Sequence, residues 1–296
     1  ALAVELLTRR PRARVFHATD FIAPFLPSIP VVATVHDLTF LTHPEILDPQ
    51  SLAYYRRLFK ARRRTAAWIT PSEWTADALM RELRIDAGSI SVIPHGLPVL
   101  EAVEQPLPLE RRQEYLLAVS TIEPRKRDDL LLDALALLPE PPRTIIVGQP
   151  GWRSAATQAR LNATPYVEWR TAVDDHALRA LYRDAWAVAV PSLAEGFGFS
   201  ALEAMAHGTP VISSGHGALP EGTGPAAIVP DADDAQGWAR AIDDLARSPH
   251  RWRELSLDGY RRAQTFSWRA SALATARVET RKVYADQLEH EGVIPA

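Results

Sequence analysis

Short apolar runs alternate along this chain with longer segments of helical periodicity, and few folds are compatible with such an alternation. Strands separated by helices indicate parallel sheets with helices on their faces. The strand-like runs form two groups. The first group has about four members, VFHA, VVATVH, WITP and ISVIP, and the second has about six, YLLAVS, TIIVG, YVEW, WAVAV, PVISS and AAIV.

A proline-rich segment without clear periodicity, residues 94–114, separates the two groups. The chain has 296 residues, 47% of them hydrophobic, which is enough for two cores of moderate size. We therefore expect a partial N-terminal domain at residues 1–106, a full doubly wound domain at 107–265, and a C-terminal helix at 266–296 that crosses back to the first domain. The shorter first group and the missing initiator Met predict an N-terminal truncation.

The composition excludes several classes of function. A formal net charge of -3 gives no basis for general nucleic-acid binding. The absence of cysteine excludes disulfides and thiolate metal sites and is compatible with a cytoplasmic location. No apolar run approaches the ~20 residues of a membrane span. The segment YYRRLFKARRR, Tyr54 to Arg64, predicts a solvated basic helix; the alternative is weak peripheral contact with anionic lipid at the inner face of the membrane.

The stretch EGFGFSALEAMAHG follows the apolar run WAVAV, so it lies at the carboxyl end of a predicted parallel strand. A helix is expected to begin near Phe199 or Ser200 and to end at Gly208, presenting its N-terminal amides to an anion. Gly196 and Gly198 allow close approach of a phosphate, while Glu195 and Glu203 suit the hydroxyls of sugars. The structural alternatives are a capping box between Ser200 and Glu203 and a solvated loop position for Glu195.

A second loop, in VSTIEPRKRDDLLLDALALL, also has the character of an anion site. Arg125 and Lys126 lie between a predicted strand and the helix that follows it, which is a favourable position for binding a diphosphate. The alternative is a basic surface turn that Asp128 and Asp129 balance.

Together the two loops resemble the donor-binding domain of the retaining glycosyltransferases of family 4. That family has the GT-B architecture, in which two Rossmann-like doubly wound domains face a cleft. The resemblance rests on two glutamates separated by seven residues within EGFGFSALEAMAHGTPV. It extends to VVATVHDLTFLTHPE, ITPSEWTADAL, VIPHG, DDHALRALYRDA and FSW, and so covers nearly the whole chain from about Val15.

The resemblance implies a role for each matching residue. Lys126 binds the donor diphosphate with Arg125, Glu195 contacts the transferred sugar, and Glu203 contacts the ribose. His36 reaches the donor sugar from the first domain. The residues assigned to catalysis are Lys126, Arg125, Glu195 and His36. The residues assigned to donor binding are Ser120, Thr121, Gly196, Phe197, Gly198, Phe199, Ser200, Glu203, Ala172 and Val173, the last two at the nucleobase.

The implied reaction is transfer of a hexosyl group, with retention, from a nucleoside diphosphate sugar to a hydroxyl of a glycan or lipid-linked acceptor. HDLTFLTHPE and EPRK favour a mannose-type donor such as GDP-mannose, and bacterial polysaccharide or glycoconjugate synthesis as the setting. No metal and no cofactor besides the donor are expected. This chain departs from the family in lacking the glycine-rich loop after the first strand.

Two alternatives remain open, and so does the oligomeric state. The first is a nucleotide-sugar-binding protein without turnover. The second is a nicotinamide-dependent oxidoreductase, against which stands the lack of a G-x-G-x-x-G motif at any strand–helix junction.

Overall fold

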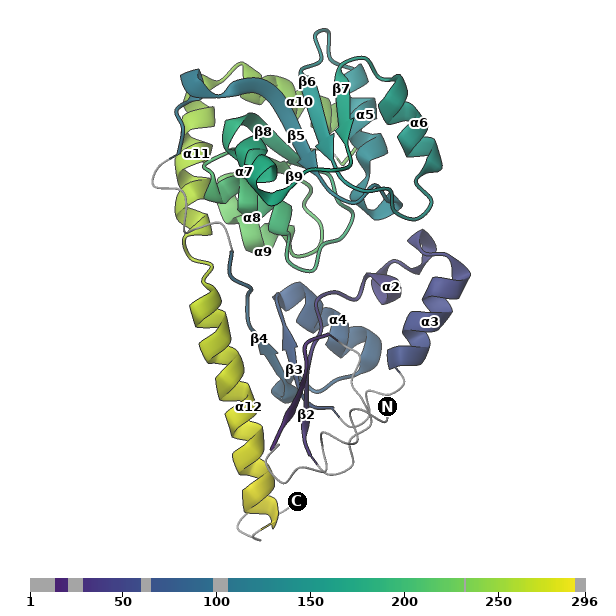
Figure 1. The fold of residues 1–296 in the computed structure, drawn as a ribbon, viewed down its shortest axis with the longest axis vertical. Coiled ribbons are helices and arrows are strands. Elements are labelled where there is room, and N and C mark those ends of the chain that lie inside the picture. Colours follow the sequence, from purple (N-terminus) through teal and green to yellow (C-terminus); the bar gives the residue numbers. More distant parts are fainter. Residues whose placement is uncertain (1–13, 21–28, 60–64, 98–105, 232, 291–296) are drawn as a thin grey trace. The chain divides into compact units, whose positions relative to one another are not determined.

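The computed structural model describes residues 14–20, 29–59, 65–97, 106–231 and 233–290. The chain divides into two compact units (Figure 1). Unit 1 comprises residues 1–96 and 268–296, and unit 2 comprises residues 97–267. The units thus divide at Gly96/Leu97 and at Ser267/Trp268, against the expected boundaries of 106/107 and 265/266.

Unit 1 contains a four-stranded parallel sheet whose order, β1-β2-β3-β4, follows the chain. The strands are β1 (Phe16–Ala18), β2 (Val31–Thr34), β3 (Thr65–Thr70) and β4 (Ile90–Val92). The helices are α2 (Thr39–Thr42), α3 (Pro49–Phe59), α4 (Glu73–Leu83) and α12 (Trp268–His290), with 3₁₀ turns at Pro44–Ile46 and Ala87–Ser89. Each strand matches one of the runs read from the sequence.

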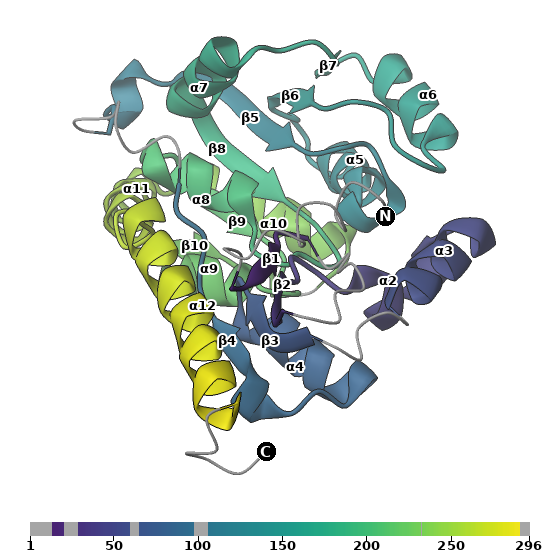
Figure 2. The ribbon, with the colours of Figure 1, turned by 60° about the horizontal axis from the view of Figure 1, so that its bottom comes forward.

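The long C-terminal helix α12 belongs to unit 1. Its Ala274 and Val278 pack against a small cluster that includes Val32 and Ile69 on one face of the sheet. The start of α12 is also fixed, because a Cβ placed on Gly96 would lie 2.0 Å from the backbone nitrogen of Trp268. Figures 1 and 2 both show α12 running beside β4.

Unit 2 contains a six-stranded sheet in the order β10-β9-β8-β5-β6-β7, with every neighbouring pair parallel. Its strands are β5 (Gln113–Val119), β6 (Arg143–Val147), β7 (Val167–Arg170), β8 (Ala185–Val190), β9 (Val211–Ser213) and β10 (Ala227–Ile228). The chain first builds outward from β5 to β7 and then returns to place β8 against the other side of β5. The strand order therefore reverses between β5 and β8, and in such sheets ligands bind beyond the carboxyl ends of the strands at this switch point.

Helices cover both faces of this sheet, as the sequence predicts for a doubly wound domain. One hydrophobic cluster joins the sheet to α7 and α8, and a second joins the opposite face to α5, α6 and α10. The helices of unit 2 are α5 (Asp128–Ala136), α6 (Ala155–Ala163), α7 (Asp175–Asp184), α8 (Phe199–Ala206), α9 (Leu219–Thr223), α10 (Ala235–Ala246) and α11 (Pro249–Ala263), with 3₁₀ turns at Leu109–Arg111, Pro124–Lys126 and Gly224–Ala226.

The helix ends follow local chemistry. The side chain of Asp174 accepts a hydrogen bond from the amide of Ala177 at the start of α7, and Ser72 caps α4 in the same way through Thr75. After α8 the chain turns at Gly208 with φ of 65°, a left-handed conformation that glycine adopts without steric cost. The sequence predicted the end at Gly208.

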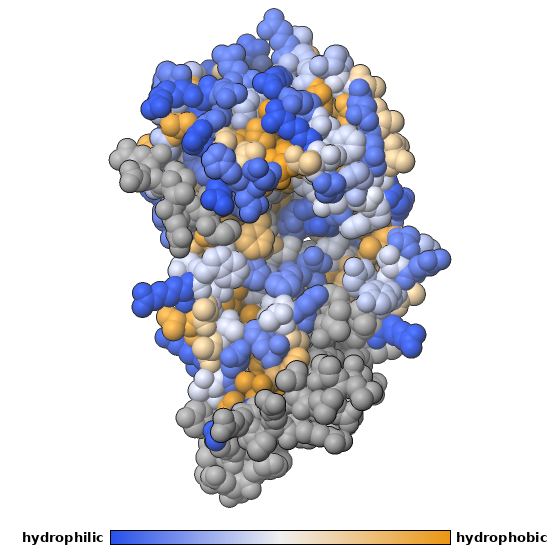
Figure 3. Space-filling view, in the orientation of Figure 1, coloured by the Kyte–Doolittle hydropathy of each residue, from blue (hydrophilic) through white to orange (hydrophobic). Residues whose placement is uncertain are grey.

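The predicted basic helix is only partly described. Helix α3, Pro49–Phe59, contains the first part of the basic segment, and residues 60–64 lie outside the described residues. Leu52 and Tyr55 pack against the core of unit 1, whereas Tyr54 is exposed. Among the described helices, none has the length and apolar composition needed to cross a bilayer. The face in Figure 3 is mainly hydrophilic with small separate hydrophobic patches, as on many globular surfaces.

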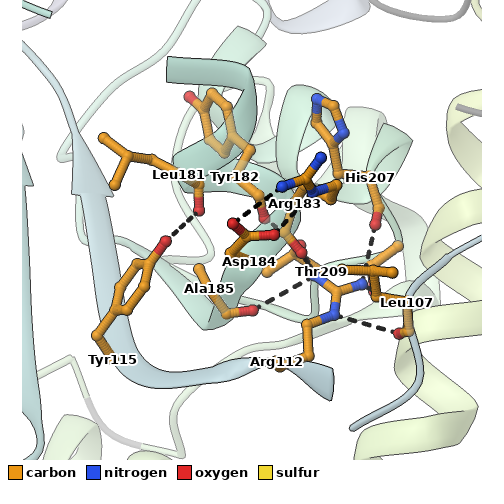
Figure 4. A network of polar contacts seen from close by, with 11 residues as sticks. Leu107, Arg112, Tyr115, Leu181, Tyr182, Arg183, Asp184, Ala185, His207 and Thr209 are labelled. Atoms are coloured by element: carbon orange, nitrogen blue, oxygen red, sulfur yellow. Dashed lines mark hydrogen bonds and ion pairs between the residues drawn. The ribbon is translucent and has the colours of Figure 1, made fainter. Parts of the chain in front are cut away.

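Arg112, at the base of β5, is a buried cation that links several loops of unit 2 (Figure 4). Its guanidinium donates to carbonyl oxygens at the end of α7 and in the turn between α8 and β9, and to the Thr209 hydroxyl. The carbonyl acceptors are those of Leu107, Arg183, Ala185, His207 and Gly208. Burial lowers the pKa of Arg112 to about 10, so the side chain stays charged at neutral pH.

Candidate functional site

The two loops singled out in the sequence lie at the switch point of unit 2. The loop after β5 carries Arg125 and Lys126, and the loop after β8 carries Glu195. Because β5 and β8 are neighbouring parallel strands, both loops leave the sheet at the same edge. The backbone joins them directly, since the amide of Leu193 donates to the carbonyl of Arg125 at 2.8 Å.

A cluster of opposite charges connects the loops. The Lys126 ammonium lies 2.5 Å from Oε1 of Glu195, and the Arg125 guanidinium lies 3.1 Å from Oε2 of the same carboxylate. The Ser192 hydroxyl donates to Oε1 at 2.7 Å. Glu195 is 8% exposed, so it is not the solvated loop residue of the alternative interpretation. Burial alone raises its pKa, but the charges of Lys126 and Arg125 hold the pKa below its ordinary value.

Glu123 is a second buried acid in this cluster, and the sequence reasoning gave it no role. It accepts a hydrogen bond from Nε of Arg125 at 2.9 Å, and Arg125 also donates to the carbonyl of Ala194. Burial raises the pKa of Glu123 against the opposing charges of Arg125 and Lys126. Arg125 therefore joins the two loops by pairing with Glu123 in one and Glu195 in the other, whereas Lys126 pairs with Glu195.

The glycine turn before α8 has the geometry of a tight helix start. Gly198 precedes the helix with φ of 88°, and a Cβ there would lie 2.8 Å from the Leu219 side chain. Gly196 and Phe197 are buried, and the Phe197 ring packs edge-on against Phe199 and Phe266. The Phe197 ring thus faces the core. The groups of this turn that a ligand could contact are therefore its backbone amides and the first turn of α8, which begins at Phe199 and includes Ser200.

The capping-box explanation for Glu203 is wrong. Because Gly198 is the N-cap, Ser200 is already inside the helix and no side chain caps it. The Glu203 side chain is instead half-buried near the Tyr182 hydroxyl. Burial raises its pKa, Tyr182 opposes that shift, and Asp175 adds to it. The surroundings of Glu203 are therefore those of a partly buried carboxyl beside Tyr182 and not of a helix cap.

The remaining donor-site predictions are spread along the same edge of the sheet. Ser120 and Thr121 directly follow β5, and the amide of Ser120 donates to the carbonyl of Val147. Ala172 and Val173 follow β7, which β6 separates from β5. Ala172 is exposed and Val173 packs partly against the core. All four positions follow the carboxyl ends of strands, as a ligand extending across this edge requires.

His36 belongs to unit 1, where it follows β2. Its Nε2 donates to the carbonyl of Thr19 at 2.8 Å, and its Nδ1 lies 3.2 Å from Nε2 of His95. Burial, with the charge of His36, lowers the pKa of His95 to about 4. The sequence reasoning missed His95, although it stands in the quoted motif VIPHG; the two histidines meet because they follow different strands of one parallel sheet.

The alternative of a basic surface turn balanced by Asp128 and Asp129 is also wrong, because Lys126 pairs with Glu195. Asp128 is 2% exposed, and Asp129 accepts hydrogen bonds from Thr157 and Arg160. The ionic partner of Lys126 is Glu195 and not either of these two acids. This pairing joins residues 69 positions apart, so only the tertiary fold reveals it.

Comparison with known protein families gives a match in each half of the chain. Residues 1–99 match the model described as "Glycosyltransferase Family 4", and residues 113–248 match that described as "Glycosyl transferases group 1". The second match contains the loops of Lys126 and Glu195.

Curated relatives include glycosyltransferases that are named for different substrates. The chain is 29% identical to O-antigen chain mannosyltransferase B of Escherichia coli, over 86% of this chain and 71% of that protein. It is 29% identical to the MMP alpha-(1->4)-mannosyltransferase of Mycolicibacterium hassiacum, over 84% of this chain and 64% of the relative. It is 30% identical to the D-inositol 3-phosphate glycosyltransferase of Rhodococcus opacus, over 67% of this chain but only 49% of that enzyme.

Solved structures with the same fold include a sucrose-phosphate synthase and Anabaena HepE. Sucrose-phosphate synthase from Thermosynechococcus elongatus matches with a TM-score of 0.76 and 25% identity, over 96% of this chain and 77% of that one. Anabaena HepE, solved with UDP and glucose, matches with a TM-score of 0.74 and 20% identity, over 93% of this chain and 80% of that one. The chain therefore belongs to the family 4, group 1 glycosyltransferases and has their GT-B fold of two Rossmann-like domains.

Proposed function

We propose that this protein is a retaining glycosyltransferase that moves a hexosyl group from a nucleoside diphosphate sugar to a hydroxyl of a glycan or lipid-linked acceptor. The proposal places it in bacterial polysaccharide or glycoconjugate synthesis, in the cytoplasm or at the inner face of the membrane. Membership of the glycosyltransferase family replaces the oxidoreductase alternative. The binding protein without turnover is distinguished by the experiment below.

The observation that carries the proposal is the cluster of Arg125, Lys126 and Glu195 at the switch point of unit 2. The two cations lie just before α5 and bind Glu195 in the loop that leads into α8, so positive charge and the starts of two helices lie at one edge of the sheet. In the structure the Glu195 carboxylate is the partner of Lys126. A donor diphosphate would compete with Glu195 for that ammonium, and this would free the carboxylate for a sugar hydroxyl.

The chemistry follows from this arrangement. As the bond between the anomeric carbon and the diphosphate oxygen breaks, negative charge grows on the diphosphate. Lys126, Arg125 and the helix termini would stabilise that charge, which is electrostatic catalysis by fixed groups. The acceptor oxygen bonds to the anomeric carbon on the same face, and its proton passes to the departing diphosphate. The protein supplies the positive charge in this scheme, so we propose no cofactor besides the donor.

The remaining roles follow the positions of the residues. Glu203 would bind the ribose, while Ala172 and Val173 would lie near the nucleobase. His36 of unit 1 would contact the transferred sugar. Two relatives that are named as mannosyltransferases support a mannose-type donor such as GDP-mannose. Anabaena HepE was solved with UDP, but it is only 20% identical to this chain. The test therefore uses both GDP and UDP.

Replacement of Lys126 by Ala tests the proposal. We expect donor consumption, measured as release of GDP or UDP from the corresponding sugars, to fall about 100- to 1,000-fold, comparable to the loss of one oxyanion donor. The fold is expected to persist, because Arg125 and Ser192 still bind Glu195. The control is Arg247→Ala, which removes a cation whose side chain is 72% exposed and should leave turnover unchanged.

The outcomes separate the two surviving functions. Turnover that falls in Lys126→Ala but not in Arg247→Ala supports the transferase. Nucleotide binding without turnover by the unaltered protein would favour the binding protein. Equal turnover in Lys126→Ala and the unaltered protein would contradict the role of the cation cluster.

A further inference from the structure

A small cavity lies beneath Lys126, between the ends of β5 and β8. Its volume is about 10 Å³, at the lower limit of the roughly 10–15 Å³ that one water molecule needs. Asp128, the first residue of α5, lines it. The other lining residues are Ala118, Val119, Ser120, Lys126, Ala189, Val190, Pro191 and Ser192. A carboxyl group has thus been placed where almost no water reaches it.

The carboxyl of Asp128 has few hydrogen bonds to offset its burial. Its Oδ1 accepts a long hydrogen bond of 3.4 Å from the Ser120 hydroxyl, and its buried Oδ2 has no hydrogen-bond partner among the described residues. Asp128 does not cap α5, because Arg127, in a left-handed conformation with φ of 57°, is the N-cap. A buried carboxylate with so few donors, the Ser120 hydroxyl and its own backbone amide, is costly, whereas a neutral carboxyl is much less so.

The charged groups around Asp128 act in opposite directions. Lys126 faces it from the preceding turn and favours the carboxylate, while Asp129 on its own helix favours the neutral acid. From β5 and β8 the cavity receives apolar side chains, Pro191 and two serine hydroxyls, which carry no charge. Burial is the largest influence and raises the pKa of Asp128 to about 7, despite the hydrogen bond from Ser120.

We propose that Asp128 takes up a proton when a nucleoside diphosphate binds beside Lys126, so that this site binds its anionic ligand and a proton together. The inference rests on the proposed donor site. A diphosphate adds negative charge next to the cation that favours ionised Asp128, and it thereby shifts Asp128 toward the neutral form. By linkage, the neutral form of Asp128 binds the diphosphate more tightly than the ionised form.

Calorimetric titration of the full chain with GDP and with UDP tests this inference. Proton uptake is obtained by repeating each titration at pH 8 in HEPES and in Tris, whose ionisation enthalpies differ. The unaltered protein should take up a fraction of a proton beyond that of the nucleotide's own titration, whereas Asp128→Asn should not. The nucleotide's contribution is the same for both proteins and cancels in the comparison.

The affinity gives a second readout. Between pH 6 and pH 8.5, the Kd of the unaltered protein should rise about fivefold or more relative to that of Asp128→Asn, because Asp128, with a pKa of about 7, loses its proton over this range and couplings between two bound ligands are typically about fivefold or larger. If Asp128→Asn fails to fold, uptake by the unaltered protein at pH 8 still tests the inference, because the terminal phosphate of GDP and UDP is almost fully ionised at that pH and contributes little uptake of its own.

Two results would overturn the inference, and only the second would also overturn the proposed function. Nucleotide binding with no uptake beyond that of the nucleotide, or with the same pH dependence in both proteins, would contradict the linkage and leave the donor site intact. Absence of GDP and UDP binding at every pH would contradict the proposed function as well.

Discussion

At the scale of single residues, Glu195 and Glu203 stand eight positions apart but have different surroundings. Glu195 is paired with Lys126 and Arg125, whereas Glu203 is half-buried near Tyr182. We expect Glu203→Gln to weaken binding of the intact donor and of the bare nucleoside diphosphate alike, since both ligands carry the ribose. Glu195→Gln should weaken binding of the donor only, because the bare diphosphate has no sugar for Glu195 to hold. Titrating each variant with both ligands gives four affinities.

The structure also predicts how Glu195→Gln changes the affinity for the bare nucleoside diphosphate. Gln has no charge with which to hold Lys126, so the bare nucleoside diphosphate should bind Glu195→Gln no more weakly than it binds the unaltered protein. Equal losses for the two ligands in Glu195→Gln would contradict its assignment to the sugar. An unchanged Glu203→Gln would remove Glu203 from the ribose site.

His207 carries a prediction about pH and stability. Neither ring nitrogen of His207 has a hydrogen-bond partner among the described residues, and its ring stacks on Tyr182. Burial, with the charge of Arg112, lowers its pKa to about 4, against about 6.5 in an unfolded chain. The unfolded state therefore binds more protons between pH 6.5 and pH 4, so this histidine lowers the stability of the fold as the pH falls through that range.

Urea unfolding at pH 7, 6 and 5 measures the effect. From pH 7 to pH 5 the unaltered protein should lose about 1–2 kcal/mol of unfolding free energy that His207→Phe, which keeps the stacked ring, does not lose. Taking the difference between the two proteins cancels other titrating groups, including Asp128, whose raised pKa acts in the opposite sense. Parallel pH profiles would show that His207 is not the group responsible.

At the scale of elements, Arg112 is the residue that ties β5 to the end of α7 and to the turn between α8 and β9 (Figure 4). Arg112→Met fills much of the same volume but leaves several buried carbonyl oxygens without a donor. We expect a loss of about 3–5 kcal/mol in unfolding free energy, as when one partner of a buried charged network is removed. Arg247→Met, an exposed cation paired with Asp243, should cost less than about 1 kcal/mol. Similar losses in the two variants, measured by urea unfolding, would contradict this assignment.

The elements also show what the sequence could predict. Strands such as β8, and helix ends such as Gly208, depend on patterns a few residues long, and the structure has both at the predicted places. The capping box failed because Gly198, in a left-handed conformation, starts α8 before Ser200. The burial of Asp128 depends on β8 packing beside β5, which joins residues more than sixty positions apart. Local pattern contains no such information, so the charged pairs and the small cavity had to come from the fold.

At the scale of the whole molecule, each unit has its own hydrophobic core. Two of the core clusters lie entirely within unit 2, and two others lie entirely within unit 1. Unit 1 needs both ends of the chain, because α12 supplies Ala274 and Val278 to one of its clusters. Unit 2 is continuous in sequence, from Leu97 to Ser267. Only unit 2 can therefore be isolated by two simple truncations.

The last prediction concerns that fragment, residues 97–267. A domain with its own core can fold alone, and Arg125, Lys126, Glu195 and Glu203 all belong to unit 2. We expect the fragment to unfold cooperatively and to bind GDP or UDP within about tenfold of the full chain's affinity, because the proposed diphosphate and ribose contacts are kept. Its affinity for the intact sugar donor should fall further, since His36 is lost with unit 1. A folded fragment that gives no calorimetric heat with either nucleotide would show that unit 2 does not contain the nucleotide site, and the roles of Lys126 and Glu203 would fall with it.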